Sequence, residues 1–462
     1  MNSNGADKMG TMPVNKLLIS MSLPMMISML IQALYNVVDS IFVAQISEDA
    51  LTAVSMAFSM QTLLVASATG IGVGLNALLS RSLGEQNHLL ASKSALNGLF
   101  LGLIAYILFA VIGMTCVKPF YIFQTNDAAS PITQYGIEYL TCVMVCSFGM
   151  YAQMLFERLL ISTGRTIYSM ITQATGAVIN IILDPIMIFG MCGMPKLGVL
   201  GAAVATVTGQ CVAAVLALIF NIKINKDISL SLKRFRPESG VIKTILSVGV
   251  PSMIMQAIGS VMTFTFNKLL IWFSSTAVAV FGIYFKINSI IFMPIFGLNN
   301  GMVPIVAYNL GAKNRIRMMK TVKYSIIYAV SLMLIGLALI EIFPRQLLML
   351  FNASENMLGI GIPALRIICL SFTFAGCSIV LSSLFQALGH GVYSMMISLI
   401  RQLFVLLPSA FILALIGKHM GNDVSYIWWS FNIAEIASIT TSILLFKRLY
   451  KNTISKIPAG DE

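Results

Sequence analysis

The sequence contains very few charged residues for its length. Of its 462 residues, 10% are Asp, Glu, Lys or Arg, whereas 58% are hydrophobic, and the mean hydropathy is +0.88. A soluble fold of this length could not cover so much apolar surface with so few charges. The composition therefore excludes a soluble globular protein and predicts one that is embedded in a lipid bilayer.

The residues of catalytic sites are scarce as well. The three histidines, His88, His390 and His419, fall in different predicted loops, so they form no metal cluster. The seven cysteines lie in or beside apolar runs without metal-ligand spacing, which indicates small core residues. No phosphate-binding G-x-x-x-x-G-K-[ST] sequence occurs. We therefore expect neither an enzyme nor a bound cofactor, and any pumping must use an ion gradient.

Twelve apolar runs follow one another along the chain. Each is long enough for a spanning helix, which needs ~20 residues, and their composition favours helices over the period-two strands of a barrel. The first run is not expected to be a signal peptide, because it is long, lacks a small-residue cleavage site and is followed at once by another span. The predicted spans are 16–46, 50–81, 92–118, 134–162, 166–190, 198–222, 243–273, 277–308, 320–343, 358–387, 393–417 and 424–446.

The net charge of +12 would suggest a nucleic-acid partner in a soluble protein, but here the basic residues are sorted by loop. Most of the 29 Lys and Arg lie at the N-terminus, in the even-numbered connections and in the C-terminal tail. The opposite connections hold only Lys118, Lys196, Arg345 and Lys418. By the positive-inside rule both termini are cytoplasmic. We expect a multi-pass protein of the plasma membrane, whose partner is the lipid bilayer and not nucleic acid.

The chain contains an internal repeat. When Gly70 is aligned with Gly297, a shift of 227 residues, the segment GIGVGLNALLSRSLGEQN (70–87) matches GLNNGMVPIVAYNLGAKN (297–314). We call this shift the repeat offset. The repeat offset spans six helices, an even number, so both copies have the same orientation in the membrane. Parallel six-helix repeats predict two bundles related by an axis along the membrane normal, an arrangement of secondary transporters. The predicted parts are an N-terminal bundle (1–222), a cytoplasmic linker (223–242) and a C-terminal bundle (243–462).

Two aspartates lie inside apolar helices of the first half. A charged Asp at a helix centre costs ~2.5–3.5 kcal/mol on insertion scales, so each invites a functional explanation. Asp39 in LYNVVDSIFVA and Asp184 in INIILDPIMIF lie ~12 Å and ~9 Å from the outer ends of their helices, at about 1.5 Å per residue. The sequence therefore places two carboxylates at similar depth. The alternative is that both acids only hydrogen-bond to amides and hold helices together.

Polar neighbours of these acids complete a candidate ion-coupling and substrate-binding site. Carboxylate, amide and hydroxyl oxygens suit Na⁺, for which Asp39, Asp184 and Asn180 would be the metal ligands. The same acids could instead bind a proton, because burial disfavours the charged form of a carboxyl group. Pro185 cannot donate to the helix ladder and is a candidate hinge. The candidate site residues are Asp39, Asp184, Asn180, Asn36, Thr206 and Tyr139, with Thr208 also within reach.

The second half lacks these acids. Phe266 aligns with Asp39 at the repeat offset, and further along the chain, where the shift becomes 225 residues, Ser409 aligns with Asp184. Its own polar residues include a candidate second substrate site made of Glu435, Arg401 and Lys286, and Lys268 and Gln402 are further polar residues of its spans. Glu435 could attract a cation or pair with Arg401, and we favour pairing. In the first half, Glu157 beside Arg158 is interpreted as an interfacial salt bridge.

Several segments resemble the multidrug and toxic compound extrusion (MATE) family over nearly the whole chain. They are SLPMMISMLIQALYNVVDSIFVAQISEDALTAVSMAF, the Gly-rich segment 70–87, INIILDPIMIFG, GAAVATVTGQ, VPIVAYNLGAKN and RQLFVLLPSAFI. The aspartate of NIILDP resembles the bacterial DinF-like branch. The resemblance implies a V-shaped pair of six-helix bundles that exports cationic or amphiphilic compounds in exchange for H⁺ or Na⁺. It also implies an ion site at Asp39, Asn180, Asp184 and Thr206, with Tyr139 as a further position.

The sequence thus predicts an all-α membrane protein of twelve transmembrane helices, acting as a monomeric antiporter for organic cations or amphiphilic drugs. Ion binding at Asp39 and Asp184 would favour one state of the bundles, and drug binding the other. The sequence leaves open whether the ion is Na⁺ or H⁺, and whether ion and drug share the carboxylates. The alternative is a flippase for a lipid-linked oligosaccharide or another anionic lipid. Its pyrophosphate would need basic residues within the spans, which are Lys268, Lys286, Arg366 and Arg401.

Overall fold

The computed structural model describes residues 7–231, 235–351 and 353–460, and in these residues it contains helices but no strand. Within these ranges, ten helices are long and apolar enough to cross a membrane, or up to twelve if each of two bent helix pairs is one span. This confirms the predicted all-α fold class, and the twelve predicted spans agree with it if each bent pair is one span. Lys233 and Arg234, which belong to the predicted linker, lie outside the described residues.

The helices of the two halves follow each other in the order of the repeat. The first half contains α1 (Asp7–Thr11), α2 (Val14–Ala44), α3 (Glu48–Gly84), α4 (His88–Thr125), α5 (Pro131–Val145), α6 (Phe148–Ser162), α7 (Thr166–Phe189), η1 (Met191–Gly193) and α8 (Val199–Lys223). The second half contains α9 (Ser239–Leu270), α10 (Ser275–Gly311), α11 (Arg315–Ile342), α12 (Pro344–Met349), α13 (Glu355–Cys369), α14 (Phe372–Ala387), α15 (Gly391–Leu399), η2 (Ile400–Leu406), α16 (Leu407–His419), α17 (Ser425–Asn452) and η3 (Ile454–Lys456).

Polar caps begin four of the long helices at positions that repeat between the halves. The hydroxyl of Ser47 accepts a hydrogen bond from the N–H three residues later at the start of α3, and Ser274 does the same for α10. The side-chain oxygens of Asn87 and Asn314 accept equivalent bonds at the start of α4 and α11. Both pairs are related by the repeat offset. These caps satisfy N–H groups that the first turn of a helix leaves free.

Two predicted spans, 134–162 and 358–387, are broken into two helices each. α5 and α6 meet at an angle of 44°, and α13 and α14 at 51°. At both breaks a serine hydroxyl donates to the carbonyl oxygen three residues earlier at 2.7 Å, from Ser147 in the first half and Ser371 in the second. A serine that bonds back to its own turn competes with the helix ladder and favours a bend. Hydrophobicity alone gave no sign of these bends.

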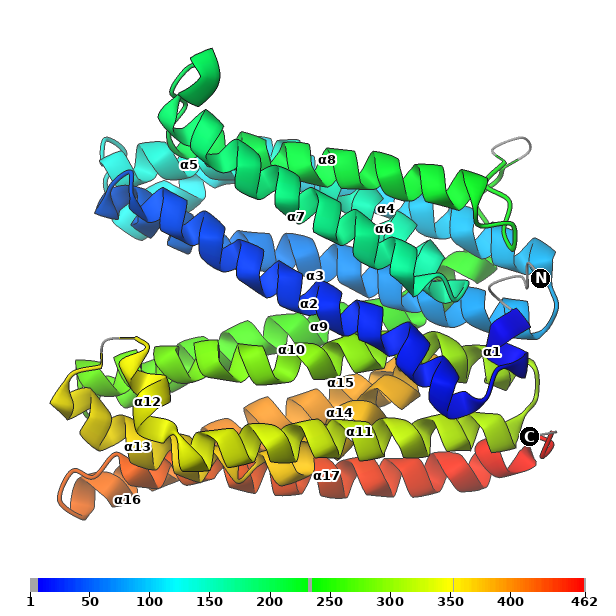
Figure 1. Cartoon of the computed structure of the whole chain (residues 1–462). Coiled ribbons are helices and arrows are strands. Elements are labelled where there is room, and N and C mark those ends of the chain that lie inside the picture. Colours follow the sequence, from blue (N-terminus) through cyan, green and yellow to red (C-terminus); the bar gives the residue numbers. More distant parts are fainter. Residues whose placement is uncertain (1–6, 232–234, 352, 461–462) are drawn as a thin grey trace.

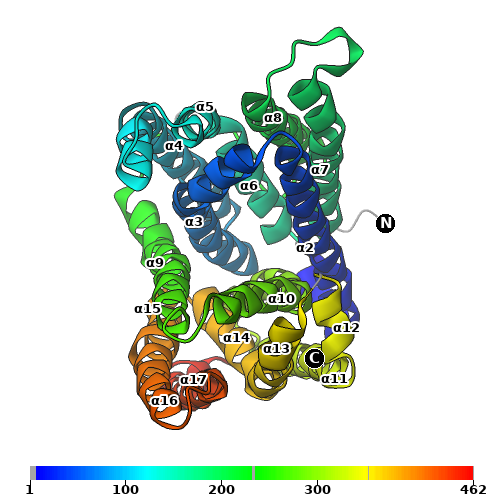
Figure 2. The same ribbon diagram turned by 90° about the vertical axis from the view of Figure 1, so that its left-hand side faces the viewer.

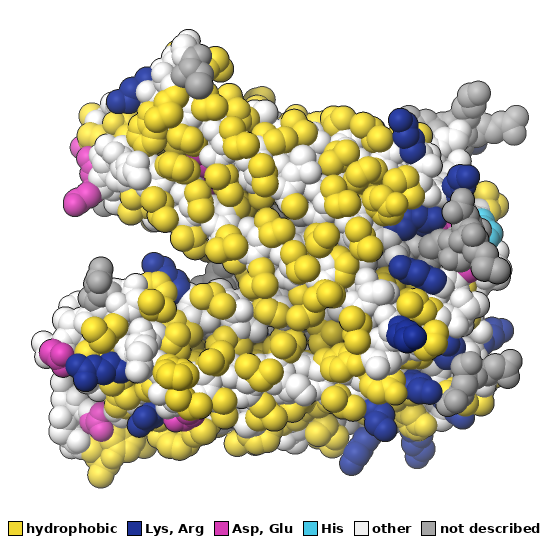
Figure 3. Space-filling model, in the orientation of Figure 1, with side chains coloured by type: hydrophobic (Ala, Val, Ile, Leu, Met, Phe, Trp, Pro, Cys, Tyr) yellow, Lys and Arg dark blue, Asp and Glu magenta, His cyan; other side chains and the backbone are white. Residues whose placement is uncertain are grey.

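The two halves lie one above the other in Figure 1, and Figure 2 views them from the left-hand end of Figure 1. Both described chain ends lie at the right-hand end of Figure 1, where Figure 3 shows most of the Lys and Arg side chains; we call this the basic end. At the opposite end, the open end, the surface is deeply hollowed between the halves (Figure 3). The hollow lies between α2 and α3 above and α10 below (Figure 1).

Glycines bring the two halves together toward the basic end. A Cβ atom on Gly74 of α3 would lie 2.0 Å from the carbonyl oxygen of Ile245 on α9, and one on Gly301 of α10 would lie 2.5 Å from the hydroxyl of Ser22 on α2. Only a residue without a side chain permits such close approach of two helices. We call these contacts, α3 with α9 and α2 with α10, the seam.

The contact of α3 with α10 repeats the internal symmetry of the sequence. A Cβ on Gly84 would meet the carbonyl oxygen of Tyr308 at 1.9 Å, and one on Gly311 would meet that of Arg81 at 2.1 Å. Gly84 and Gly311 are related by the repeat offset, and so are Arg81 and Tyr308. The α3–α10 contact is therefore made twice, once by each copy of the same two positions. The predicted axis between the bundles runs through this contact.

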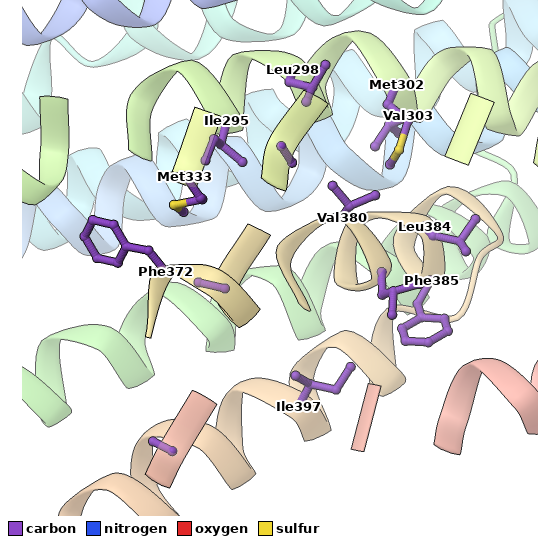
Figure 4. Close-up of a cluster of buried hydrophobic side chains, with 14 of the residues drawn as sticks. Ile295, Leu298, Met302, Val303, Met333, Phe372, Val380, Leu384, Phe385 and Ile397 are labelled. Carbon is purple, nitrogen blue, oxygen red and sulfur yellow. The ribbon is translucent and has the colours of Figure 1, made fainter. Parts of the chain in front are cut away.

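The hydrophobic core is continuous across the seam. One cluster of buried side chains joins Leu17 of α2 and Leu75 of α3 to residues of every long helix in the second half. Figure 4 shows part of it, where Leu298 and Met302 of α10 face Val380 of α14. A second, smaller cluster, which includes Tyr121 and Tyr139, belongs to the first half alone. The two halves are thus joined at one end and packed separately at the other.

We expect Gly74→Val to open the seam, because its side chain has no space against the backbone of α9. Overpacking of this kind costs ~1–3 kcal/mol. The melting temperature of the purified protein in detergent should fall by several degrees. Gly282→Val on α10 is the matched control, because nothing lies within 4 Å of a Cβ at that position. Equal melting temperatures for the two variants would show that the seam does not depend on glycine.

Candidate functional site

Asp39 and Asp184 come together between α2 and α7, which lie side by side (Figure 2). Asp184 is fully buried, and Oδ1 of Asp39 is buried without a hydrogen-bond partner. The two carboxyl groups lie within hydrogen-bonding reach of each other. Two carboxylates this close repel unless a proton or a cation lies between them. The pair therefore offers a place for one positive charge.

Asn180 links this pair to α8. In either orientation of its amide, Asn180 donates to a carboxylate oxygen of Asp184 at 3.3 Å and bonds the hydroxyl of Thr206 at 3.2 Å. Asn180 lies one helical turn before Asp184 on α7, so both side chains share a face. Both residues are almost fully buried, and Thr206 is 8% exposed. Three helices, α2, α7 and α8, thus contribute oxygen atoms to one buried cluster.

Two tyrosines stand beside the acid pair. Tyr35, one turn before Asp39 on α2, lies within electrostatic reach of both carboxyl groups, and Tyr139 of α5 lies within reach of Asp39. The hydroxyl of Tyr139 accepts a hydrogen bond from Nε2 of Gln61 on α3 at 3.2 Å. Sequence reasoning missed Tyr35 and Gln61. The four-residue spacing from Tyr35 to Asp39 was the available signal for the first, whereas no pattern indicated the second.

Three other predicted participants lie elsewhere or show no special geometry. The side chain of Asn36 is exposed and, among the described residues, bonds neither acid. The hydroxyl of Thr208 donates to the backbone carbonyl of Val204 at 2.7 Å instead of facing the site. Pro185 lies within α7, which remains helical to Phe189, so its role as a hinge stays a prediction.

The oxygen atoms of the cluster fit a small monovalent cation or a proton. Asp39, Asp184, Asn180 and Thr206 supply carboxylate, amide and hydroxyl oxygens, which are ligands of hard cations. The unpartnered Oδ1 of Asp39 leaves one buried acceptor free for such an ion. In the described residues, no group of three or more His, Cys, Asp or Glu could hold a metal ion. A cation at this place would therefore be held by a pair of acids and by neutral groups.

The candidate site of the second half is only partly assembled. Nη1 of Arg401 lies 2.8 Å from Oε1 of Glu435, so these two residues pair, while Oε2 of Glu435 is buried without a partner. Lys286 is exposed, and its ammonium lies 5.5 Å from the ring centre of Phe351 instead of joining them. Arg401 belongs to η2, a seven-residue π-helix. Such π segments are rare and often occur at functional sites.

At the position that aligns with Asp39, the second half has an aromatic core. Phe266 is fully buried, and its ring centre lies 4.6 Å from that of Phe281 and 5.1 Å from that of Phe431. The hydroxyl of Ser409, which aligns with Asp184, donates to the backbone carbonyl of Val405 at 2.6 Å. Apolar packing thus fills the place of Asp39, and Ser409 supplies no acid.

The interpretation of Glu157 as an interfacial salt bridge with Arg158 is wrong. Glu157 is 3% exposed and accepts three hydrogen bonds from neutral side chains of α6 and α7. Nη1 of Arg158 instead crosses to α10 and donates to Oδ1 of Asn300 at 2.9 Å. Consecutive helical residues point in different directions, so the two side chains do not meet.

Two six-helix halves, a seam at one end, a hollow at the other and buried carboxyl groups define a class: a membrane transporter with multiple spans. A family model described as MatE matches residues 24–186 and 251–412, one match in each half. The chain belongs to the MatE family, and it is a transporter, not an enzyme. The starting points of the two matches are related by the repeat offset.

Curated relatives are similar over almost the whole chain. The multidrug export protein MepA of Staphylococcus haemolyticus is 26% identical over 452 residues, which cover 96% of this chain and 95% of the relative. MepA of Staphylococcus aureus is 26% identical over 451 residues, with 96% of each chain covered. The resemblance to the MATE family is therefore confirmed, whereas the DinF-like branch stays a prediction.

Solved structures of MATE transporters have the same fold. The structure described as "Outward-facing conformation of a multidrug resistance MATE family transporter of the MOP superfamily" matches with a TM-score of 0.89 and 25% identity, covering 99% of this chain and all of that one. One described as "Crystal structure of MATE in complex with MaL6" also gives 0.89 and 25% identity, covering 98% of this chain and all of that one. This agrees with the predicted fold class.

We expect Arg401→Met to destabilise the second half. The variant leaves the carboxylate of Glu435 buried without its cation. Breaking a charged hydrogen bond of this kind costs ~1–3 kcal/mol of unfolding free energy. The cost is less than for a fully buried pair, because Arg401 is 28% exposed. Thermal unfolding in detergent measures the loss. Arg345→Met, which breaks an exposed pair with Glu355, should have little effect. Recovery in Arg401→Met/Glu435→Gln is expected, and its absence would contradict the pairing as the cause.

Proposed function

We propose that the protein is a secondary active multidrug efflux transporter of the plasma membrane, which exports cationic or amphiphilic organic compounds in exchange for H⁺ or Na⁺. The observation that carries this proposal is the pair of Asp39 and Asp184, in which Asp184 is fully buried and Oδ1 of Asp39 is buried without a hydrogen-bond partner. Intramembrane acids are costly and mark ion pathways. The name of the MepA relatives, multidrug export protein, supports drugs as the exported substrates.

The orientation follows from the basic end. Cytoplasmic loops of membrane proteins are rich in Lys and Arg, so the basic end and both chain termini face the cytoplasm. The hollow at the open end then faces outward (Figure 3), and the seam closes the cytoplasmic side. The structure would thus represent the state that releases drug and takes up ions from outside.

The acid pair can convert ion binding into a change of shape. An H⁺ or Na⁺ between Asp39 and Asp184 removes their repulsion and draws α2 and α7 together. α2 also forms half of the seam through its contact with α10, so a shift of α2 reaches the cytoplasmic closure. A ligand changes an equilibrium only by binding the two states differently. The ion therefore favours one state and the drug the other, either at the same carboxylates or through α7 at Pro185.

The flippase alternative requires unpaired basic groups beside the hollow. Arg401 pairs with Glu435 at 2.8 Å, and Nε of Arg366 lies 3.5 Å from a carboxylate oxygen of Glu341. The ammonium of Lys268 lies over the ring of Phe264 at 5.0 Å. These cations are engaged within the second half, so they give little support to a pyrophosphate site. The drug exporter is the better supported function.

We expect Asp39→Asn and Asp184→Asn each to abolish ethidium efflux from a pump-deficient bacterium at matched membrane levels, because neither variant can form the anionic pair that attracts an ion. Dye retention measured by fluorescence should equal that of cells without the protein. Asp49→Asn, an exposed acid in the first turn of α3, is the control and should export as the wild type does. Normal export by both site variants would make the acids structural.

A second measurement identifies the ion. Proteoliposomes that contain the wild type receive either a pH gradient or a Na⁺ gradient of equal size, and ethidium movement is recorded. Transport with one gradient only names the coupling ion, and transport with neither contradicts ion-coupled export. If the wild type exports no dye in cells either, the flippase alternative is tested by measuring whether the protein moves a lipid-linked oligosaccharide from one leaflet of the proteoliposome to the other.

A further inference from the structure

A second buried acid of the first half, Glu157, has no role in the site described above. It lies in α6, five residues before the helix ends at the basic end, and is 3% exposed. Oε1 of Glu157 accepts hydrogen bonds from Nε2 of Gln153 at 3.0 Å and from the hydroxyl of Thr172 at 2.9 Å. Oε2 accepts from Nε2 of Gln173 at 2.8 Å. We call these four residues the Glu157 cluster.

The cluster is far from the acid pair. Thr172 and Gln173 lie 11 to 12 residues before Asp184 on α7, which is ~17 Å at the rise of an α-helix. Arg158 is the charged group that acts on the Glu157 carboxylate. In the described part of the chain, the helices packed on α6, namely α3, α4, α7, α8 and α10, contribute no other charge that acts on it. Glu157 is thus a separate acid with neutral bonding partners.

The cluster has unused acceptors on the same face of α7. Oε1 of Gln173 is buried without a partner, and so is the hydroxyl of Ser169, one turn earlier. Ser169 is fully buried. Native proteins rarely leave such groups unpaired unless the site has another state or another occupant. A structural role alone would account for the three bonds to Glu157, but not for the unpaired oxygen of Gln173.

The bonding pattern suits a proton better than a metal cation. Three N–H or O–H groups point at the carboxylate, and a cation cannot lie where donors point. A carboxylate has about four acceptor sites, so one remains for a proton. Once Glu157 is protonated, its new O–H can donate to Oε1 of Gln173 after rotation of that amide. The unpaired oxygen thus has a partner in the protonated state.

The next residue along α6 connects the cluster to the seam. Arg158 donates to Asn300 of α10 at 2.9 Å across the contact of the two halves. If the halves part at the basic end, this bond breaks and water can reach α6 beside Glu157. We propose that the Glu157 cluster is a second proton-binding site, which exchanges its proton with the cytoplasm when the seam opens. The assignment of this exchange to the cytoplasmic side rests on the proposed function.

The test uses pH-difference infrared spectroscopy of the purified full-length protein, which detects the carbonyl band of a buried protonated carboxyl group without any transport. Wild type and Asp39→Asn/Asp184→Asn should both show a band component that Glu157→Gln lacks. The lost amplitude should correspond to one carboxyl group. Glu355→Gln, whose side chain is 87% exposed, is the control and should retain the whole band.

Two further variants guard against misfolding as the cause. Glu157→Asp keeps the acid and should retain the carbonyl band component. Gln173→Leu keeps Glu157 but removes a hydrogen-bond donor and the unpaired oxygen, so it should shift the pH midpoint at which the Glu157 component appears. An unchanged band in Glu157→Gln would overturn the proposal, and so would an unchanged midpoint in Gln173→Leu. If the component follows Glu157 while the wild type exports no dye, the proton site stands and the export proposal fails.

Discussion

The close contact of two helix pairs at the basic end determines most of what the rest of the structure can do. At Gly74 and Gly301 there is no room for a side chain between α3 and α9 or between α10 and α2. Because backbone contacts close this end in the structure, the halves are apart only at the other end, where the hollow lies (Figure 3). The same helices that form the seam, α2 above all, carry or border the acid pair. The closure of the basic end and the acid pair therefore involve shared helices.

The two halves share a scaffold but differ in their buried charge. The capping residues and the glycines repeat at a constant spacing, because helix starts and close helix contacts constrain both copies equally. Buried charge follows a different rule, since each acid must find a partner or an ion. The first half places the carboxyl groups of Asp39 and Asp184 beside each other, whereas the second half pairs Glu435 with Arg401. The two similar bundles thus differ in the groups that lie beside their intramembrane acids.

Much of the fold could be predicted from the sequence, because spans are set by hydrophobicity and the repeat by identity. The meeting of Asp39 and Asp184 was also predictable, since both lie at the same depth in neighbouring helices. The side of a helix is harder to predict: Asn36 is three residues from Asp39 yet exposed, while Tyr35 at four residues faces the site. The bends at Ser147 and Ser371 depend on a hydroxyl that finds its own backbone, which no hydrophobic pattern encodes.

Because of the π-helix η2, the residue that aligns with Asp184 in sequence is not the residue that takes its place in the second half. A π segment accommodates one residue more than the α-helix it interrupts. Before the π-helix, buried Ser169 and Thr172 correspond to buried Ser394 and Ile397, and both pairs are 225 residues apart. After it the burial pattern follows a spacing that is longer by one, so that the fully buried partner of Asp184 is Ala410. The place of the missing second acid thus belongs to Ala410 and not to Ser409. A carboxylate introduced at Ala410 would still lack a partner acid, because the position that aligns with Asp39 is the buried Phe266.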